Sequence, residues 1–165
     1  MKKRYWIFPA MLLLAMAEIG CGDDSTINDP ANITTANARV SECGGFNDSL
    51  KRWSADDIME AVIWSYDAES AILRILDSEV ILNCCGDRTI EAQVSDAVIT
   101  ISESDMEPEN GRCRCECSYD FAIDITGLSA GEYTLIVKRT IDQESRVLVE
   151  TVIDLSSPSG SISIP

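Results

Sequence analysis

The chain of 165 residues contains no histidine. Catalysis by Ser–His or Cys–His pairs and metal binding through imidazole are therefore excluded within this chain. Basic residues are also few, because 13 lysines and arginines stand against 28 aspartates and glutamates, which gives a formal net charge of −15. This excess of negative charge repels nucleic acid, so we expect no nucleic-acid partner. Walker and G-x-G-x-x-G motifs are absent as well, and the one G-x-S-x-G match, Gly127 to Gly131, has no histidine in the chain to activate its serine. Carboxylate chemistry of the glycosidase type is therefore the hydrolytic mechanism to consider.

Candidates for carboxylate chemistry are present by residue type alone. Asp56 and Asp57 are adjacent, and Asp120 and Asp124 fall on the polar face of a predicted strand, where a solvated surface is the simpler interpretation. The acidic segment 102–111 could offer oxygens to calcium, but it lacks the spacing of an EF-hand, so we interpret it as an acidic loop. The sequence therefore predicts a non-enzymatic protein with no catalytic residue, no metal and no cofactor.

The chain also lacks an apolar run long enough to span a membrane. Its longest apolar stretch, Tyr5 to Ala17, contains Pro9 and falls short of the roughly 20 residues that a membrane-spanning helix needs. Lys2, Lys3 and Arg4 precede this stretch. A positive start followed by a short apolar region is typical of a cleaved signal peptide, which we predict over residues 1–20.

Two cleavage sites compete at the end of this segment. Ala15-Met16-Ala17 is an A-x-A site for ordinary secretion. Gly20-Cys21 resembles the end of a lipobox, in which the cysteine sulfur receives a diacylglycerol, although Glu18 stands where a lipobox usually carries leucine. From this resemblance we predict lipidation of Cys21. The two or three acyl chains of a lipidated protein anchor it stably to a membrane. The residue after Cys21 is Gly22, whereas the inner-membrane retention signal carries aspartate there. This difference favours the outer membrane of the cell envelope, with the protein on its periplasmic or surface face. Secretion is the alternative.

Composition divides the rest of the chain into three parts. Residues 21–42 are polar and aperiodic, and such a composition predicts a flexible tether. Residues 43–155 have the size of one domain with its own core. Residues 156–165 contain serine, proline and glycine and are predicted to be a flexible tail.

Within the domain the apolar residues recur with a period of two, which indicates strands rather than helices. The clearest example runs from Cys113 to Ile125 and predicts one long strand with a bend or bulge near Ser118. Trp53 and Trp64 are interpreted as core residues rather than a carbohydrate platform. Further alternating segments, separated by turn signals, begin at Val62, Ala71, Val80, Ile90, Val98, Tyr133 and Val147. This pattern predicts an all-β fold, an immunoglobulin-like β-sandwich of about seven strands stapled by disulfides.

The seven cysteines are the most distinctive feature of the sequence. If Cys21 is lipidated, an even number remains, which in an oxidising compartment indicates disulfides. These residues are Cys43, Cys84, Cys85, Cys113, Cys115 and Cys117. Two residues along a strand separate Cα atoms by about 6.6 Å, near the upper limit for a disulfide.

Disulfides within the 113–117 group are therefore disfavoured, and a bond between the adjacent Cys84 and Cys85 would close a strained ring. If each of the three strand cysteines pairs with Cys43, Cys84 or Cys85, six of the fifteen connectivities remain. Such a match of two triplets predicts staples between the two sheets. A thiolate site for zinc, copper(I) or an iron–sulfur cluster is the alternative, although the spacing differs from the C-x₂-C pairs of structural zinc sites.

Two of these cysteine motifs carry a resemblance to a known group of proteins. The segment 83–86 (Asn-Cys-Cys-Gly) followed by 113–120 (Cys-x-Cys-x-Cys-x-Tyr-Asp) resembles a group of uncharacterised bacterial lipoproteins. A Gly-x-Tyr hairpin at 131–133 and the segment 64–67 (Trp-Ser-Tyr-Asp) are similar too, and 127–135 is similar to hairpins of immunoglobulin-like and prealbumin-like extracellular modules. The resemblance covers about half of the chain and implies export and lipidation, but no activity.

These observations together predict an exported, lipid-anchored bacterial protein that acts as a non-catalytic structural or binding module. Its expected partners are the membrane, through the lipid, and a protein or glycan that the sequence does not define. A thiol-based metal-binding or redox protein of the cell envelope is the second hypothesis, and a carboxylate hydrolase is the third.

Overall fold

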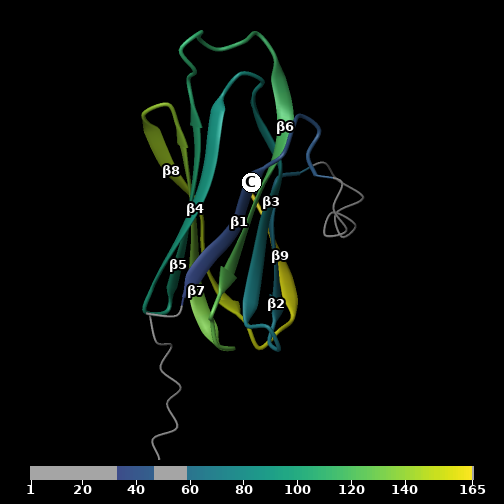
Figure 1. Ribbon diagram of the computed structural model, residues 1–165, viewed down its shortest axis with the longest axis vertical. Helices are drawn as coiled ribbons and strands as arrows, with labels where there is room; N and C mark the ends of the chain where they lie inside the picture. The colour runs from purple at the N-terminus through teal and green to yellow at the C-terminus, as the bar shows by residue number, and fades with distance from the viewer. Residues whose placement is uncertain (1–32, 47–58, 165) are drawn as a thin grey trace, which may run out of the picture.

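The alternating segments form two β-sheets that pack face to face (Figure 1). The computed structural model describes residues 33–46 and 59–164. The expected signal peptide, Cys21, Trp53, Asp56 and Asp57 therefore lie outside the described residues. The predicted all-β class and the disulfide-stapled β-sandwich are confirmed, with nine strands among the described residues instead of about seven. The strands are β1 (Thr34–Val40), β2 (Ala61–Asp67), β3 (Ile72–Asn83), β4 (Asp87–Ser95), β5 (Val98–Met106), β6 (Glu116–Thr126), β7 (Glu132–Ile141), β8 (Glu144–Asp154) and β9 (Ser159–Ser163).

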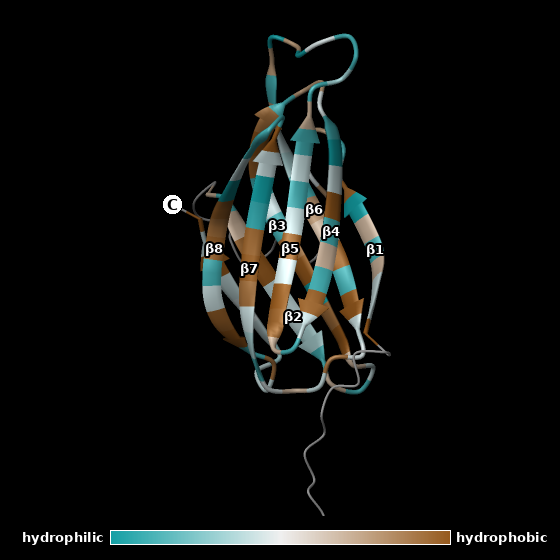
Figure 2. Ribbon diagram, turned by 90° about the vertical axis from the view of Figure 1, so that its left-hand side faces the viewer, coloured by the Kyte–Doolittle hydropathy of each residue, from teal (hydrophilic) through white to brown (hydrophobic). Residues whose placement is uncertain are grey.

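One sheet has five strands in the order β1-β6-β3-β2-β9, and the other has four in the order β4-β5-β7-β8. Neighbouring strands are antiparallel except for β5 and β7, which pair in parallel. Figure 2 looks onto the four-stranded sheet and shows that the ends of β5 and β7 nearest the β5–β6 connection are more hydrophilic than their beginnings. Polar side chains are therefore concentrated toward one end of the sandwich.

The core lies between the sheets and is built from alternate residues of both. Leu73 and Ile75 of β3 face Ile99 and Ile101 of β5 across this layer, each at most 2 % exposed. Trp64 is 6 % exposed, which confirms its interpretation as a core residue. The inner face of each strand therefore follows the period of two that the sequence shows.

The bulge lies in the five-stranded sheet but not on the predicted strand. The register between β3 and β6 shifts between Asp77 and Val80, and Glu79 has a φ of 61°. Ser78 and Glu79 thus stand opposite the single residue Asp120. The one extra residue belongs to β3, and β6 itself keeps its alternation past Ser118. This bulge explains why Ile75 and Val80, which have opposite parity in the sequence, both point into the core.

The domain extends beyond both of its predicted boundaries. β1 occupies residues 34–40 of the expected tether, because its backbone pairs with β6. β9 occupies residues 159–163 of the expected tail and pairs with β2. Gly160 permits this pairing, since a Cβ there would lie 2.7 Å from the ring of Trp64. Neither strand is buried on both faces, so their apolar signal is weak.

Among the described residues, no helix is long and apolar enough to cross a bilayer.

Candidate functional site

Three disulfides gather at one end of the sandwich. Their Cα–Cα distances of 5.5, 5.6 and 5.4 Å are in the normal range. Each joins one cysteine of the 113–117 group to one of the earlier cysteines, so the pairing is one of the six connectivities that strand geometry allows. The bonds are Cys43–Cys117, Cys84–Cys115 and Cys85–Cys113.

The disulfides do not connect one sheet to the other, which corrects the expected staple between sheets. Cys43 follows β1, Cys84 follows β3, and their partners lie in or just before β6. Since β1, β6 and β3 are neighbours in one sheet, the bonds join strands of the same layer. Cys113 and Cys115 precede β6, which begins at Glu116, because the chain there still belongs to the β5–β6 connection.

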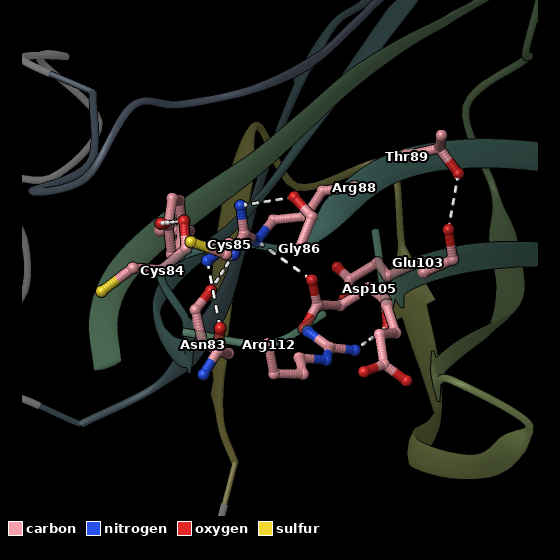
Figure 3. Close-up of polar contacts among 12 residues, drawn as sticks. Asn83, Cys84, Cys85, Gly86, Arg88, Thr89, Glu103, Asp105 and Arg112 are labelled. Atoms are coloured by element: carbon pink, nitrogen blue, oxygen red, sulfur yellow. Dashed lines mark hydrogen bonds and ion pairs between the residues drawn. The ribbon is translucent and has the colours of Figure 1, made fainter. Parts of the chain in front are cut away.

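Two of the bonds, Cys84–Cys115 and Cys85–Cys113, fasten the β3–β4 and β5–β6 connections, which pass from one sheet to the other at this end. The third bond, Cys43–Cys117, fastens the segment after β1 to β6. Asn83 holds the same two connections through its side-chain amide (Figure 3). Its Oδ1 accepts hydrogen bonds from the N–H groups of Cys85 and Cys113 at 3.1 and 3.0 Å, and its Nδ2 donates to the Cys113 carbonyl at 2.7 Å. Covalent and hydrogen bonds therefore fix the same pair of segments.

A buried carboxylate, Asp105 at the end of β5, organises the polar part of this end. Its side chain is 1 % exposed and accepts a hydrogen bond from Arg112 Nη1 at 2.5 Å, while Arg88 Nε lies 3.3 Å from its other oxygen. Arg88 also donates to the carbonyls of Asn83 and Gly86, and its guanidinium stacks 3.8 Å from the centroid of the Tyr119 ring. The two arginines compensate the buried charge, as a carboxylate in this position requires.

Arg112 extends this network toward the surface. Its Nη2 donates to the Asp105 carbonyl at 2.8 Å and to Asp142 Oδ1 at 2.6 Å. Although burial lowers it, the pKa of Arg112 is raised overall by its hydrogen bonds to Asp142 and Asp105. The guanidinium is therefore cationic and bound to two carboxylates.

Gly86 is the point where the disulfides and the charges come closest. A Cβ on this residue would overlap the carboxylate of Asp105 and approach Arg112. Only glycine lets the β3–β4 connection pass this close to the buried ion pair.

A surface hollow of about 390 Å³ lies beside this network. Its lining residues are Cys85, Gly86, Asp87, Pro108, Asn110, Gly111, Arg112 and Cys113. Asp87, Asn110 and Arg112 are its polar side chains. The Cys85–Cys113 disulfide and the ion pairs of Arg112 fix part of this lining.

Asp120 is buried, which corrects its placement on a solvated polar face. Its exposed fraction is 0 %, and its side-chain oxygens accept hydrogen bonds from the N–H groups of Phe46 at 2.6 Å and Glu79 at 3.1 Å. The carboxylate therefore satisfies backbone donors of the β3 bulge and of the segment after β1. Asp124 does lie near the surface, where Asn37 and Arg74 contact it.

The acidic loop predicted at 102–111 is also corrected. Residues up to Met106 belong to β5, and both Glu103 and Asp105 are 1 % exposed. Both side chains continue the inward parity of Ile99 and Ile101, a signal that the sequence contains. No cluster of three or more histidine, cysteine, aspartate or glutamate residues suited to a metal ion occurs in the part of the chain that the structure describes.

Comparison with known proteins adds no relative to this description. No family model, curated protein or solved structure matches the chain.

Proposed function

We propose that this chain is an exported bacterial protein, anchored to the outer membrane by a lipid on Cys21, that acts as a non-catalytic structural or binding module of the cell envelope. The observation that supports it most is the cysteine count. Six of the seven cysteines are paired in three disulfides, so Cys21 is the one left over. Disulfides persist in oxidising compartments, and the remaining cysteine directly follows the predicted signal peptide of residues 1–20.

The roles of the buried carboxylates support a module rather than an enzyme. Asp105 is bound by Arg88 and Arg112, and Asp120 by backbone N–H groups. Each is engaged in holding the connections between strands. The hollow beside Arg112 is the surface that we assign to a protein or glycan partner.

Replacing Cys21 by serine should release the protein from the membrane. The unaltered chain, expressed with its own signal in a bacterial host, should sediment with membranes, enter the detergent phase, and carry the added mass of a diacylglyceryl group. Cys21→Ser should lose that mass and leave the membrane fraction, since the acyl chains supply the anchor. A variant with Cys43 and Cys117 both replaced by alanine is the matched control and should remain in the membrane. Recovery of the unaltered chain in a soluble fraction would contradict the anchor.

Alkylation separates the module from the thiol-based alternative. In denaturant, the Cys21→Ser protein should take up no label before reduction and six labels after it, because all its cysteines are bonded. Peptide mapping should recover the Cys43–Cys117 link separately from the pair of links between 84–85 and 113–115. Labelling without reductant, or a metal that purifies with the protein, would favour a metal-binding or redox protein instead.

A further inference from the structure

Four charged side chains meet between the two sheets. Asp77 of β3 comes from one sheet, and Glu103 of β5 and Arg139 of β7 come from the other. Asp77 and Glu103 are 1 % exposed and Arg139 is 2 % exposed. Glu60, directly before β2, completes the cluster at 21 % side-chain exposure. Three carboxylates thus share one guanidinium in the core.

Arg139 reaches all three carboxylates. Its Nε and Nη2 donate to Glu103 Oε2 at 2.8 and 2.7 Å, Nη2 also donates to Asp77 Oδ2 at 2.7 Å, and Nη1 lies 2.9 Å from Glu60 Oε1. One oxygen of Asp77 (Oδ1) and one of Glu103 (Oε1) are left buried without a hydrogen-bond donor among the described residues. Buried polar atoms without partners are costly, so the arrangement needs a further donor.

The two carboxyl groups are neighbours, because one nitrogen of Arg139, Nη2, lies 2.7 Å from an oxygen of each. An ionised carboxylate has no donor, whereas a protonated one has an O–H group that the other can accept. A single proton would therefore satisfy the unpaired oxygens. It would also reduce the charge of the cluster from −2 to −1, which matters because uncompensated charge is most costly where water is absent.

The charged surroundings favour the proton on Asp77. Burial and the nearby charge of Glu103 raise the pKa of Asp77 well above its usual range, against the attraction of Arg139. Burial also raises the pKa of Glu103, but its bonds to Arg139 oppose this rise. Asp105, two residues further along β5, is bound by its own arginines, so the groups that act on the pair are Arg139 and Glu60.

We propose that Asp77 and Glu103 bind one proton between the sheets, and that the folded sandwich takes up this proton when it forms. In the unfolded chain both carboxyls titrate near pH 4. Above that pH the folded state holds a proton that the unfolded state has lost, so stability falls as pH rises until the shared proton leaves the folded state too. One proton of difference changes the unfolding equilibrium constant about tenfold per pH unit.

Asp77→Asn tests this assignment, because an amide supplies permanently the donor that the proton provides. Guanidinium unfolding of the purified mature protein, with its disulfides intact, should be measured from pH 5 to pH 8. The unfolding equilibrium constant of the unaltered protein, divided by that of Asp77→Asn, should rise about tenfold per pH unit over this window. The rise should end at the pH at which the proton leaves the folded state. Glu150→Gln, which removes an exposed carboxylate from β8, is the matched control and should keep the pH profile of the unaltered protein. Parallel profiles for the unaltered protein and Asp77→Asn would overturn the proposal.

An infrared measurement on the unaltered protein keeps the test independent of how well a variant folds. The folded protein at pH 7 should show the carbonyl band of one buried, protonated carboxylic acid, and unfolding should abolish it. Absence of this band in the folded protein at pH 7, or its persistence after unfolding, would overturn the shared proton.

Discussion

Replacing Cys43 and Cys117 together by alanine should lower the free energy of unfolding by about 4 kcal/mol, the largest loss expected from any of the three disulfides. The two residues are 74 positions apart. When Cys84–Cys115 is in place, the loop that Cys43–Cys117 closes is shorter but still long, because it runs from Cys43 to Cys84 and then from Cys115 to Cys117. Opening such a loop restores much conformational freedom to the unfolded chain. Guanidinium unfolding of the double variant, compared with the unaltered protein, measures the loss.

The matched control is the double variant of Cys85 and Cys113. This pair lies inside the loop that Cys84–Cys115 closes, so its own bond adds only a very small ring. Its removal should cost no more than about 2 kcal/mol. Asn83 also keeps hydrogen bonds to the backbone of both positions. Equal losses in the two double variants would contradict a stabilisation set by loop length.

Arg139→Met should lower the free energy of unfolding by about 3–5 kcal/mol at pH 7.5, because it leaves buried carboxylates without their cation. The loss should shrink toward pH 5. Without the arginine, Asp77 and Glu103 must be protonated to remain buried, and acid supplies those protons. Arg146→Met, at an exposed position of β8, should change stability by less than about 0.5 kcal/mol.

Unfolding in guanidinium at both pH values measures these differences. A loss for Arg139→Met that is the same at pH 5 and pH 7.5 would show that the guanidinium contributes packing rather than charge. Adding Asp77→Asn to Arg139→Met should recover part of the loss, since the two residues are in contact and their effects are coupled.

The turns and the core were predictable because each has a local signal. The breaks between strands at 68–71, 127–131 and 142–143 lie at or beside the turn signals of the sequence, of which the last, at 142–145, overlaps the start of β8. Trp64 lies in the core. The exposed edge strands were missed for the opposite reason. β1 has almost no buried side chain, so its pairing with β6 depends on backbone hydrogen bonds that any residue can make.

The charged core residues break the usual association of alternation with apolar character. Asp77 follows Leu73 and Ile75 at the same parity, and Arg139 follows Leu135 and Val137. Extending each alternation past its last apolar residue would have placed both side chains between the sheets. The contact between Arg139 and Glu103 could not be predicted from the sequence. The two residues are neighbours only because β5 and β7 pair in parallel within one sheet.

The disulfide connectivity is a similar case. Strand geometry reduces the pairings to six, and the strand order selects one of them. β6 lies between β1 and β3, so Cys43 meets it from one side and Cys84 from the other. The register continues from Leu82 opposite Cys117 and Asn83 opposite Glu116, which brings Cys84 to Cys115.

The same connectivity determines when the native bonds can form. Every disulfide needs a partner from the 113–117 segment. In a chain that crosses a membrane amino terminus first, Cys43, Cys84 and Cys85 would all enter the oxidising side before any correct partner has arrived. The thiols available to oxidants at that stage are only one another, and such early bonds would have to be exchanged later. If the chain is exported as proposed, its correct maturation should therefore require a thiol–disulfide isomerase as well as an oxidase.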